Sequence, residues 1–306
     1  MDNLAHQGRF VPEAWPTIGV YDAQGDLNLM EQALYTADVI TTVSPTYAEE
    51  IKRPEYGFGL DPLLRERSGR VVGILNGLDT AVFDPATDPH IAQNFSIDDW
   101  SGKAVCKAAL QREVGLPERP DAPLIGVVSR LDDQKGIDLI VQALGPLIEG
   151  SDAQLMVLGS GYGPYEDAFR AATAAHPDRV ANYIGFHAPL AQRVYAGADI
   201  FLMPSSFEPC GLSQMIAMRY GTIPVVRATG GLVDTVPDMS RPDGIGAVFA
   251  EYTVGAMLEG LARALAAYRQ PNDWAYFVRR AMAQDFSWAA AAARYDDVYR
   301  WALTTR

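Results

Sequence analysis

A regular alternation of strand-like and helix-like segments runs through the second half of the chain and constrains its fold more than any other feature. Short apolar runs such as Leu124–Val128 and Ile200–Met203 are typical of buried strands. The predicted strands cover residues 124–128, 154–158, 180–186, 200–203, 222–226 and 247–249, and the predicted helices 136–148, 165–175, 189–198 and 215–220. Such alternation predicts βαβ units and a parallel sheet with right-handed crossovers. We therefore expect an α/β fold, closed by helices near 254–269, 272–284 and 287–304.

The first 76 residues do not share this rhythm. Residues 11–26 are expected to form a loop, 27–35 a helix and 47–52 the start of another. The only strand-like runs are 39–43 and 71–75, and two strands are too few for an independent domain. This part of the sequence therefore looks like the end of a domain whose beginning is absent.

Composition excludes several classes of function. The chain of 306 residues is 48% hydrophobic and carries a formal net charge of -13 without a Lys/Arg-rich run, which argues against nucleic acid or an anionic membrane surface as the main partner. The two cysteines, Cys106 and Cys210, are far apart in sequence, and we expect a cytoplasmic protein. The four histidines show no metal-ligand spacing, and no metal site is expected.

The segment 204–214 lies between an apolar strand and a helix start, the position at which open α/β sheets bind ligands. Its carboxylate, Glu208, suits a sugar hydroxyl, and the amides of Gly211, Leu212 and Ser213 at the helix N-terminus suit a phosphate. The two together suggest a phosphorylated sugar as ligand. A nucleophilic role for Cys210 has little support because no histidine lies near it in sequence.

Two cations follow another predicted strand. Arg130 and Lys135 could reach one diphosphate from two sides. The alternative is that both are solvated surface charges near a helix start, which the second phosphate-suited loop at 204–214 disfavours. Further candidates are weaker when taken singly. Phe186 could stack on a nucleotide base or belong to the core. Three glycine-containing segments could approach a ligand closely or be plain turns: Gly159 with its neighbours, Thr229-Gly230-Gly231 and Asn76-Gly77.

In order along the chain, these motifs resemble those of bacterial glycogen synthases and plant starch synthases. The matching segments are Asn3-Leu4-Ala5-His6-Gln7-Gly8, Thr41-Thr42-Val43-Ser44-Pro45-Thr46, Leu75-Asn76-Gly77-Leu78-Asp79, Ser129-Arg130-Leu131, Gln134-Lys135-Gly136, Glu208-Pro209-Cys210-Gly211, Thr229-Gly230-Gly231-Leu232 and Asp285-Phe286-Ser287-Trp288. The resemblance implies a retaining glycosyltransferase of the GT-B type, which has two Rossmann-like domains. It also implies transfer of glucose from ADP-glucose to the non-reducing end of an α-1,4-glucan in glycogen biosynthesis, without a metal.

The resemblance assigns roles to single residues. Arg130 and Lys135 match the cations that hold the donor diphosphate and stabilise the departing nucleotide, and Glu208 matches the carboxylate that grips the donor glucose. We expect these three residues to be catalytic. The expected donor-binding residues are Asn76, Gly159, Phe186, Pro209, Cys210, Gly211, Leu212, Ser213, Thr229, Gly230 and Gly231.

The resemblance also predicts a division of the chain. Residues 1–76 would be the remnant of an acceptor-side domain, 77–286 a complete nucleotide-sugar-binding domain, and 287–306 a helix crossing back to the first. A chain without most of the acceptor-side domain is expected to be inactive alone and to expose surface for a missing half or a second copy. The expected partners are thus a nucleotide sugar and an α-glucan, and a plastid location would apply to a plant protein.

Departures from the family pattern keep alternatives open. Asp2 stands where the family usually has a histidine that contacts the donor sugar. One alternative is a module that binds ADP or ADP-glucose without catalysis. Another is a sucrose- or trehalose-type synthase, which usually carries a second glutamate eight residues after the first; Ile216 occupies that position here and favours the glycogen synthase branch.

Overall fold

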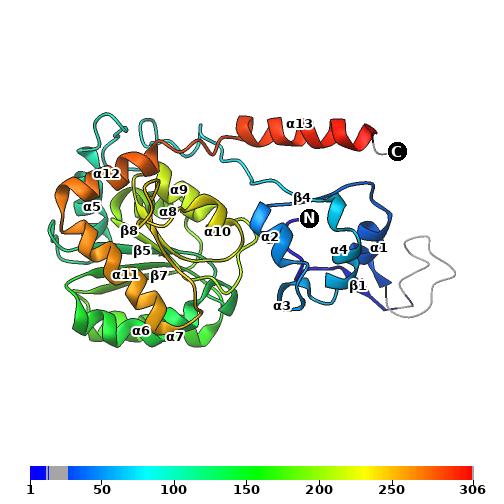
Figure 1. Cartoon of the computed structure of the whole chain (residues 1–306). Coiled ribbons are helices and arrows are strands. Elements are labelled where there is room, and N and C mark those ends of the chain that lie inside the picture. The colour runs from blue at the N-terminus through cyan, green and yellow to red at the C-terminus, as the bar shows by residue number, and fades with distance from the viewer. Residues whose placement is uncertain (12, 14–26, 305–306) are drawn as a thin grey trace.

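A six-stranded sheet forms the centre of the larger lobe (Figure 1). The computed structural model describes residues 1–11, 13 and 27–304. The sheet strands are β5 (Leu124–Val128), β6 (Gln154–Gly159), β7 (Val180–Ile184), β8 (Ile200–Met203), β9 (Ile223–Arg227) and β10 (Ala247–Phe249). Their order is β10-β9-β8-β5-β6-β7, and every neighbouring pair is parallel. This confirms the predicted α/β fold and places the reversal of strand order between β5 and β8, where ligands bind in such sheets.

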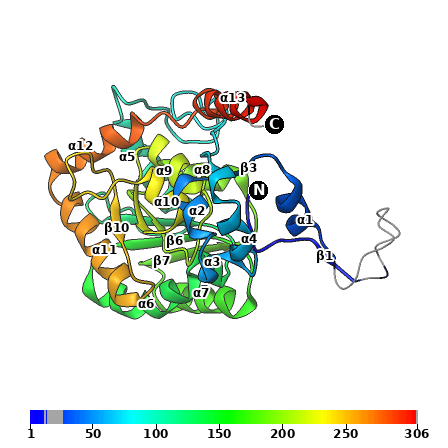
Figure 2. The same ribbon diagram turned by 45° about the vertical axis from the view of Figure 1, so that its right-hand side comes forward.

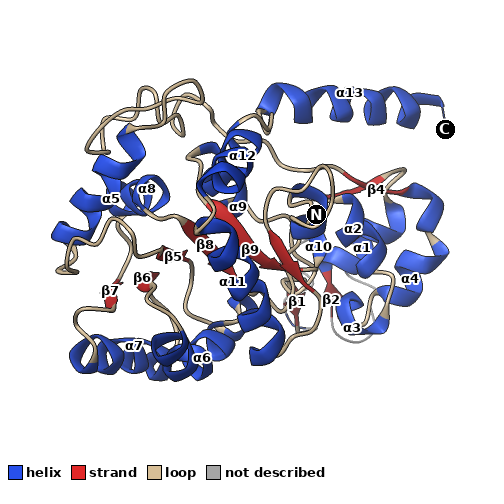
Figure 3. Ribbon diagram, turned by 60° about the vertical axis from the view of Figure 1, so that its left-hand side comes forward, coloured by secondary structure: helices blue, strands red, loops and turns tan. Residues whose placement is uncertain are grey.

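Helices cover both faces of this sheet. In Figure 1, α6 and α7 lie below it, and α5, α8, α9 and α12 lie above. Figure 3 shows α11 running past β9 at the near edge. The bounds are α5 (Gly102–Glu113), α6 (Ile137–Gly150), α7 (Gly163–Ala175), α8 (Ala188–Gly197), α9 (Ser213–Arg219), α10 (Gly230–Thr235), α11 (Val254–Tyr268) and α12 (Pro271–Met282).

The smaller lobe is built from the first part of the chain. Its elements are β1 (Arg9–Phe10), β2 (Leu27–Asn28), α1 (Leu29–Thr36), β3 (Ile40–Thr42), α2 (Pro45–Glu50), α3 (Pro54–Gly57), α4 (Asp61–Glu66) and β4 (Val71–Gly73). The two strands expected over 39–43 and 71–75 appear as β3 and β4, which form a parallel pair apart from the large sheet. Strands β1 and β2 form a separate antiparallel pair. The expected loop over 11–26 falls largely outside the described residues.

The last helix, α13 (Trp288–Thr304), leaves the large lobe and runs above the small one (Figures 1 and 2). The chain enters it beside the connection between the lobes, where the Leu78 amide donates to the Phe286 carbonyl at 2.6 Å. Side chains toward the C-terminal end of α13 are open to solvent, among them Tyr299 and Leu303. The expected exposure of surface for a missing half and the division of the chain at residues 76 and 286 stay predictions.

Several local predictions differ from the structure, and the short helices α3, α4 and α10 were not predicted. The helix expected from residue 27 begins at Leu29, because Asn28 caps it by accepting a hydrogen bond from the Glu31 amide. The strand expected over 180–186 ends at Ile184, because Gly185 has a φ of +146°, outside the range of a regular strand. The helix α5 was not predicted at all.

The described residues contain neither a candidate membrane-spanning helix nor a candidate metal cluster. No described helix has both the length and the apolar character that crossing a membrane would require. Within the same residues, no cluster of three or more histidine, cysteine, aspartate or glutamate side chains is arranged to hold a metal ion.

Candidate nucleotide-sugar site

The loops that follow β5 and β8 meet at the point where the strand order reverses. After β5 the chain forms a short 3-10 turn, Asp133–Lys135, which is capped by the Asp132 carboxylate accepting from the Lys135 amide. The next residue, Gly136, has a φ of +69°, and a Cβ there would lie 2.1 Å from the Pro204 carbonyl oxygen. Only glycine therefore allows the two loops to pack this closely. This contact fixes Lys135 against the loop that carries Glu208.

Lys135 and Glu208 form an ion pair at the centre of this junction. The Lys135 Nζ lies 2.6 Å from Glu208 Oε2, and the two side chains are 17% and 6% exposed. The Ser205 hydroxyl donates to the same carboxylate oxygen at 3.0 Å. Burial of a paired carboxylate at the end of a parallel strand is an arrangement suited to holding a polar ligand, because both groups are already desolvated and oriented.

Arg130 occupies a different environment from Lys135. Its side chain is 60% exposed and pairs with Asp132 at 2.7 Å, and its guanidinium also donates to Gln134 at 3.0 Å. The structure thus brings Lys135 to Glu208 directly and leaves Arg130 at the rim of the junction, free to reorient toward a ligand because an exposed ion pair is weak.

A cavity of about 260 Å³ opens beside Arg130 between the ends of β5, β6 and β7. Its lining includes Val128, Gly159 and Phe186. The Phe186 side chain is 90% exposed, so the interpretation of this residue as part of the core was wrong. An aromatic ring held open beside an apolar cavity at the ends of parallel strands is the arrangement that a planar ring system would stack on.

The N-terminal end of α9 faces the same junction. Pro209 and Cys210 are buried, Gly211 adopts a φ of +75°, and Leu212 and Ser213 lead into the helix. The amides at a helix start lack intrahelical acceptors and suit an anion. Burial, together with the nearby Glu208 carboxylate, raises the pKa of the Cys210 thiol to about 11. The thiol is therefore protonated at neutral pH, which agrees with the weak support for a nucleophilic cysteine.

The amides of Gly230 and Gly231 donate to acceptors within the protein. Gly230 N donates to Glu50 at 2.9 Å and Gly231 N to the Glu208 carbonyl at 3.0 Å, and the Thr229 hydroxyl also donates to Glu50. These donors are occupied because residues 230–235 form helix α10, packed against α2 of the small lobe. Both amides thus have acceptors within the protein, and the expected role of Gly230 and Gly231 in binding the donor stays a prediction.

Gly159 and Asn76 are placed by contacts within the protein. A Cβ on Gly159 would lie 1.9 Å from the Ser129 carbonyl oxygen, so glycine is needed there for loop packing, although the residue also lines the cavity at Phe186. Asn76 lines a separate cavity of about 330 Å³ beneath the start of α13. The Asn76 backbone hydrogen bonds the Cys210 thiol, which brings it to the site from the small-lobe side.

Several supporting residues were not identified from the sequence. Buried Arg227 donates from Nε to the Ser205 carbonyl at 2.9 Å and from its guanidinium to the Ser206 carbonyl, so it fixes the backbone of the Glu208 loop. The Ser44 hydroxyl donates to the Pro209 carbonyl at 2.6 Å from the small lobe. The one available signal was an arginine directly after the predicted strand 222–226, where a buried guanidinium would need acceptors.

Comparison with known proteins agrees with this geometry. Residues 111–281 match the family model "Glycosyl transferases group 1", and residues 2–66 match "Starch synthase catalytic domain". Glycogen synthase of Anaeromyxobacter dehalogenans (strain 2CP-1 / ATCC BAA-258) is 52% identical over 97% of this chain and 64% of its own length. Glycogen synthase of Desulforudis audaxviator is 46% identical over 98% of this chain and 62% of its own length. The chain thus spans somewhat less than two thirds of these curated relatives.

Solved structures give the same picture. The catalytic domain of starch synthase IV from Arabidopsis thaliana, bound to ADP and acarbose, superposes with a TM-score of 0.93 at 33% identity, covering 99% of this chain and 66% of that one. Sucrose-phosphate synthase from Thermosynechococcus elongatus, at 21% identity and a TM-score of 0.62 over 91% of this chain and 61% of that one, shares the fold alone. The chain therefore belongs to the group 1 glycosyltransferases of GT-B fold, in the family of the glycogen and starch synthases.

Proposed function

We propose that this protein is a glycogen synthase, which transfers glucose from ADP-glucose to the non-reducing end of an α-1,4-glucan with retention of configuration. The observation that carries the proposal is the buried Lys135–Glu208 pair, 2.6 Å apart, between the open cavity at Phe186 and the start of α9. A cation, a carboxylate, an aromatic ring and a helix N-terminus are the groups that a nucleotide sugar needs. The relatives named glycogen synthase, and the starch synthase solved with ADP and acarbose, support the choice of substrates.

The roles follow from the positions of these groups. Lys135 and Arg130 meet the donor diphosphate, and the amides at the start of α9 add fixed partial charges to it. Glu208, released from Lys135 by the phosphate, accepts hydrogen bonds from the donor glucose, and Phe186 stacks on the base. Stabilising the charge that develops on the departing nucleotide is the main catalytic contribution, because the donors are already oriented. The proposed reaction needs no metal ion.

Donor binding is the first property to test, because the groups that carry it lie within the described residues. Calorimetric titration with ADP should give saturable binding that weakens at least about tenfold, equivalent to about 1.4 kcal/mol, in Arg130→Ala and Lys135→Ala. Arg112→Ala is the matched control, since Arg112 is an exposed arginine paired with Glu118 on another part of the lobe. Equal ADP affinity in all four proteins would remove the donor site from this junction.

Turnover separates the synthase from a module that only binds the nucleotide. The purified protein is incubated with ADP-glucose and maltoheptaose, and elongated products are measured. Elongation that Glu208→Gln abolishes supports the synthase; ADP binding without elongation under all conditions supports the binding module for this polypeptide. The proposal includes a cytoplasmic location, because both cysteines are free and buried, as in proteins of a reducing compartment.

A further inference from the structure

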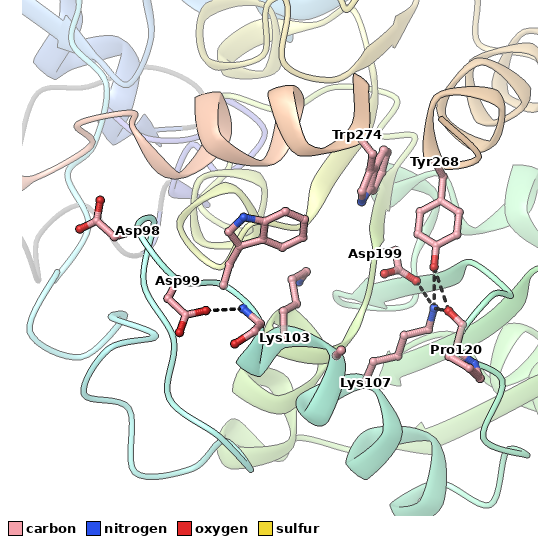
Figure 4. A pocket seen from close by; sticks show the side chains of 11 residues that line it. Asp98, Asp99, Lys103, Lys107, Pro120, Asp199, Tyr268 and Trp274 are labelled. Atoms are coloured by element: carbon pink, nitrogen blue, oxygen red, sulfur yellow. Dashed lines mark hydrogen bonds and ion pairs between the residues drawn. The ribbon is translucent and has the colours of Figure 1, made fainter. Parts of the chain in front are cut away.

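Another cavity, whose lining Figure 4 shows, lies at the amino ends of the sheet strands, opposite the nucleotide-sugar junction. It has a volume of about 460 Å³, compared with about 260 Å³ for the cavity at Phe186. Its lining includes Pro120, which precedes β5, and Asp199, which directly precedes β8. Glu208 follows β8 instead, so the strand separates the two sites. The roles proposed above involve no residue of this cavity.

Aromatic side chains from two layers form its walls. Figure 4 shows Tyr268, at the end of α11, and Trp274, on α12, reaching down toward α5, which contributes Lys103 and Lys107. Trp100 lines the cavity from the segment before α5 and is half-buried. The Tyr268 and Trp274 rings meet edge to face at 5.1 Å. Trp274 is largely buried, and among the described residues none accepts a hydrogen bond from its indole.

The charges beneath these rings are already compensated within the protein. Lys107 Nζ lies 2.7 Å from Asp199 and also donates to the Ala122 carbonyl at 2.7 Å and to the Tyr268 hydroxyl at 2.9 Å. Lys103 Nζ donates to Thr222 at 2.6 Å and to the Tyr220 carbonyl at 3.0 Å. Neither lysine therefore has a strong donor left for an anion.

The rim of the cavity is acidic. Asp98 and Asp99 are exposed there, and hydrogen bonds from Ser101 lower the pKa of Asp99, so the carboxylate stays charged at neutral pH. These carboxylates repel nucleotides and other anions while accepting hydrogen bonds from hydroxyl groups. Figure 4 shows Asp98 and Asp99 at the margin of the cavity, away from Tyr268 and Trp274. A cation covered by these two rings would therefore lie far from both carboxylates, which disfavours an organic cation as the ligand.

We propose that this cavity, the tryptophan pocket, binds a segment of neutral α-glucan. A glucose ring presents C–H groups on its faces and hydroxyls around its edge, and so matches aromatic walls with hydrogen-bonding groups at the margin. That the saccharide is an α-glucan rests on the proposed function. A polymer held here raises its effective concentration at the junction on the other edge of the sheet, as any second attachment point does.

The test compares a blocked pocket with a matched surface change. Ala104 lines the cavity and is exposed on α5, while its neighbour Val105 is exposed and is not part of the lining. Ala104→Arg fills the cavity, and Val105→Arg adds the same side chain outside it. Maltoheptaose is titrated into the full chain and followed by tryptophan fluorescence. We expect a dissociation constant on the order of 1 mM, raised at least about fivefold in Ala104→Arg and unchanged in Val105→Arg.

Trp100→Ala provides a second variant, and ADP titration of every protein gives an independent measure of the donor site. Unchanged ADP binding beside weakened maltoheptaose binding supports the pocket. The proposal is overturned if maltoheptaose binds equally well to wild type and Ala104→Arg, or if it does not bind wild type. This holds whatever the result with Trp100→Ala. Binding of tetraethylammonium in place of maltoheptaose also overturns it. If the wild type does not bind ADP, the result counts against the proposed function. The maltoheptaose comparison would still decide whether the tryptophan pocket binds a glucan.

Discussion

Single side chains hold the Glu208 carboxylate in place before any ligand arrives. Lys135 approaches Glu208 to 2.6 Å and the Ser205 hydroxyl approaches it to 3.0 Å, and both Ser205 and Glu208 are buried. A hydrogen bond to a charged, buried group contributes more than one at the surface, because its loss leaves the acceptor without compensation. Ser205 is thus a positioning residue whose contribution can be measured without the substrate.

Ser205→Ala is expected to lower the free energy of unfolding by about 2 kcal/mol, because Glu208 loses a donor in a place that water does not readily reach. Urea denaturation followed by circular dichroism measures the change. Ser68→Ala is the control, since Ser68 is exposed and surface substitutions of this kind fall within about 0.5 kcal/mol. Equal stability of the two variants would mean that Lys135 alone holds the carboxylate.

Lys103 predicts a particular dependence of stability on pH. Burial lowers its pKa from 10.5 to about 8. Between these two values the unfolded chain binds the proton that the folded protein has released, so the free energy of unfolding rises with pH across this window. Below pH 8 both states are protonated and the penalty for burying the charge is present in full.

Lys103→Met removes this titration. From pH 7 to pH 9.5 the wild type should gain about 2 kcal/mol relative to the variant, measured as the difference between their urea unfolding free energies at each pH. Comparing the two proteins cancels the tyrosines and cysteines that titrate in both. Parallel pH profiles would show that Lys103 keeps an ordinary pKa.

At the level of elements, the loops at the carboxyl edge of the sheet pack so closely that glycines are required by backbone contacts. Gly159→Ala would place a Cβ 1.9 Å from the Ser129 carbonyl oxygen, whereas nothing lies within 4 Å of a Cβ on Gly255 in α11. We expect Gly159→Ala to destabilise the protein by about 3 kcal/mol, since backbone on both sides must move. Gly255→Ala should stabilise it by about 0.5 kcal/mol. Thermal unfolding measures both changes. If Gly159→Ala is as stable as the wild type but binds ADP more weakly, Gly159 is needed for the approach of the ligand and not for loop packing.

The elements that could be predicted are those whose apolar pattern is regular. The sheet strands and α11, α12 and α13 appear within a few residues of the predicted bounds. Helix α5 was missed because its buried face is polar: Lys103, Lys107 and Gln111 lie four residues apart on one side, and all are buried. Their acceptors lie far along the chain, at Thr222, Asp199 and Gln154, so no local pattern could reveal the compensation.

The candidate site divides in the same way. The loop that carries Glu208 after β8, and the position of Lys135 in the loop after the neighbouring strand β5, were predicted from strand ends and helix starts. The use of Gly230 N by Glu50 could not be predicted, because it depends on how α2 docks against α10, elements 180 residues apart in sequence. Local sequence thus locates the groups at the sheet edge, and long-range packing determines which of their donors remain open.

On the scale of the whole molecule, the two lobes are joined through the loops of the candidate site. The Ser44 hydroxyl reaches the Pro209 carbonyl at 2.6 Å, and Glu50 reaches the Gly230 amide at 2.9 Å. Ser44 caps the start of helix α2, and Glu50 is its last residue. Phe58 adds an edge-to-face ring contact with Phe207 at 5.6 Å. A substitution at these contacts between the lobes should therefore destabilise the Pro209–Leu212 backbone and α10 more than the rest of the large lobe.

Asp234 allows this coupling to be tested. Its carboxylate accepts from the Thr46 amide at 2.8 Å and from the Thr46 hydroxyl at 2.7 Å, so it caps α2 of one lobe from α10 of the other. Asp234→Asn keeps the shape, removes the charge at the helix N-terminus and should cost about 1 kcal/mol. Hydrogen exchange should speed up in residues 44–50, 209–212 and 229–236, and remain unchanged in strands β5 and β6. Asp296→Asn, which breaks an exposed ion pair with Arg300 on α13, is the matched control. Faster exchange spread evenly over the large lobe would instead mean that the lobes unfold as one unit, and that the joint does not single out the site.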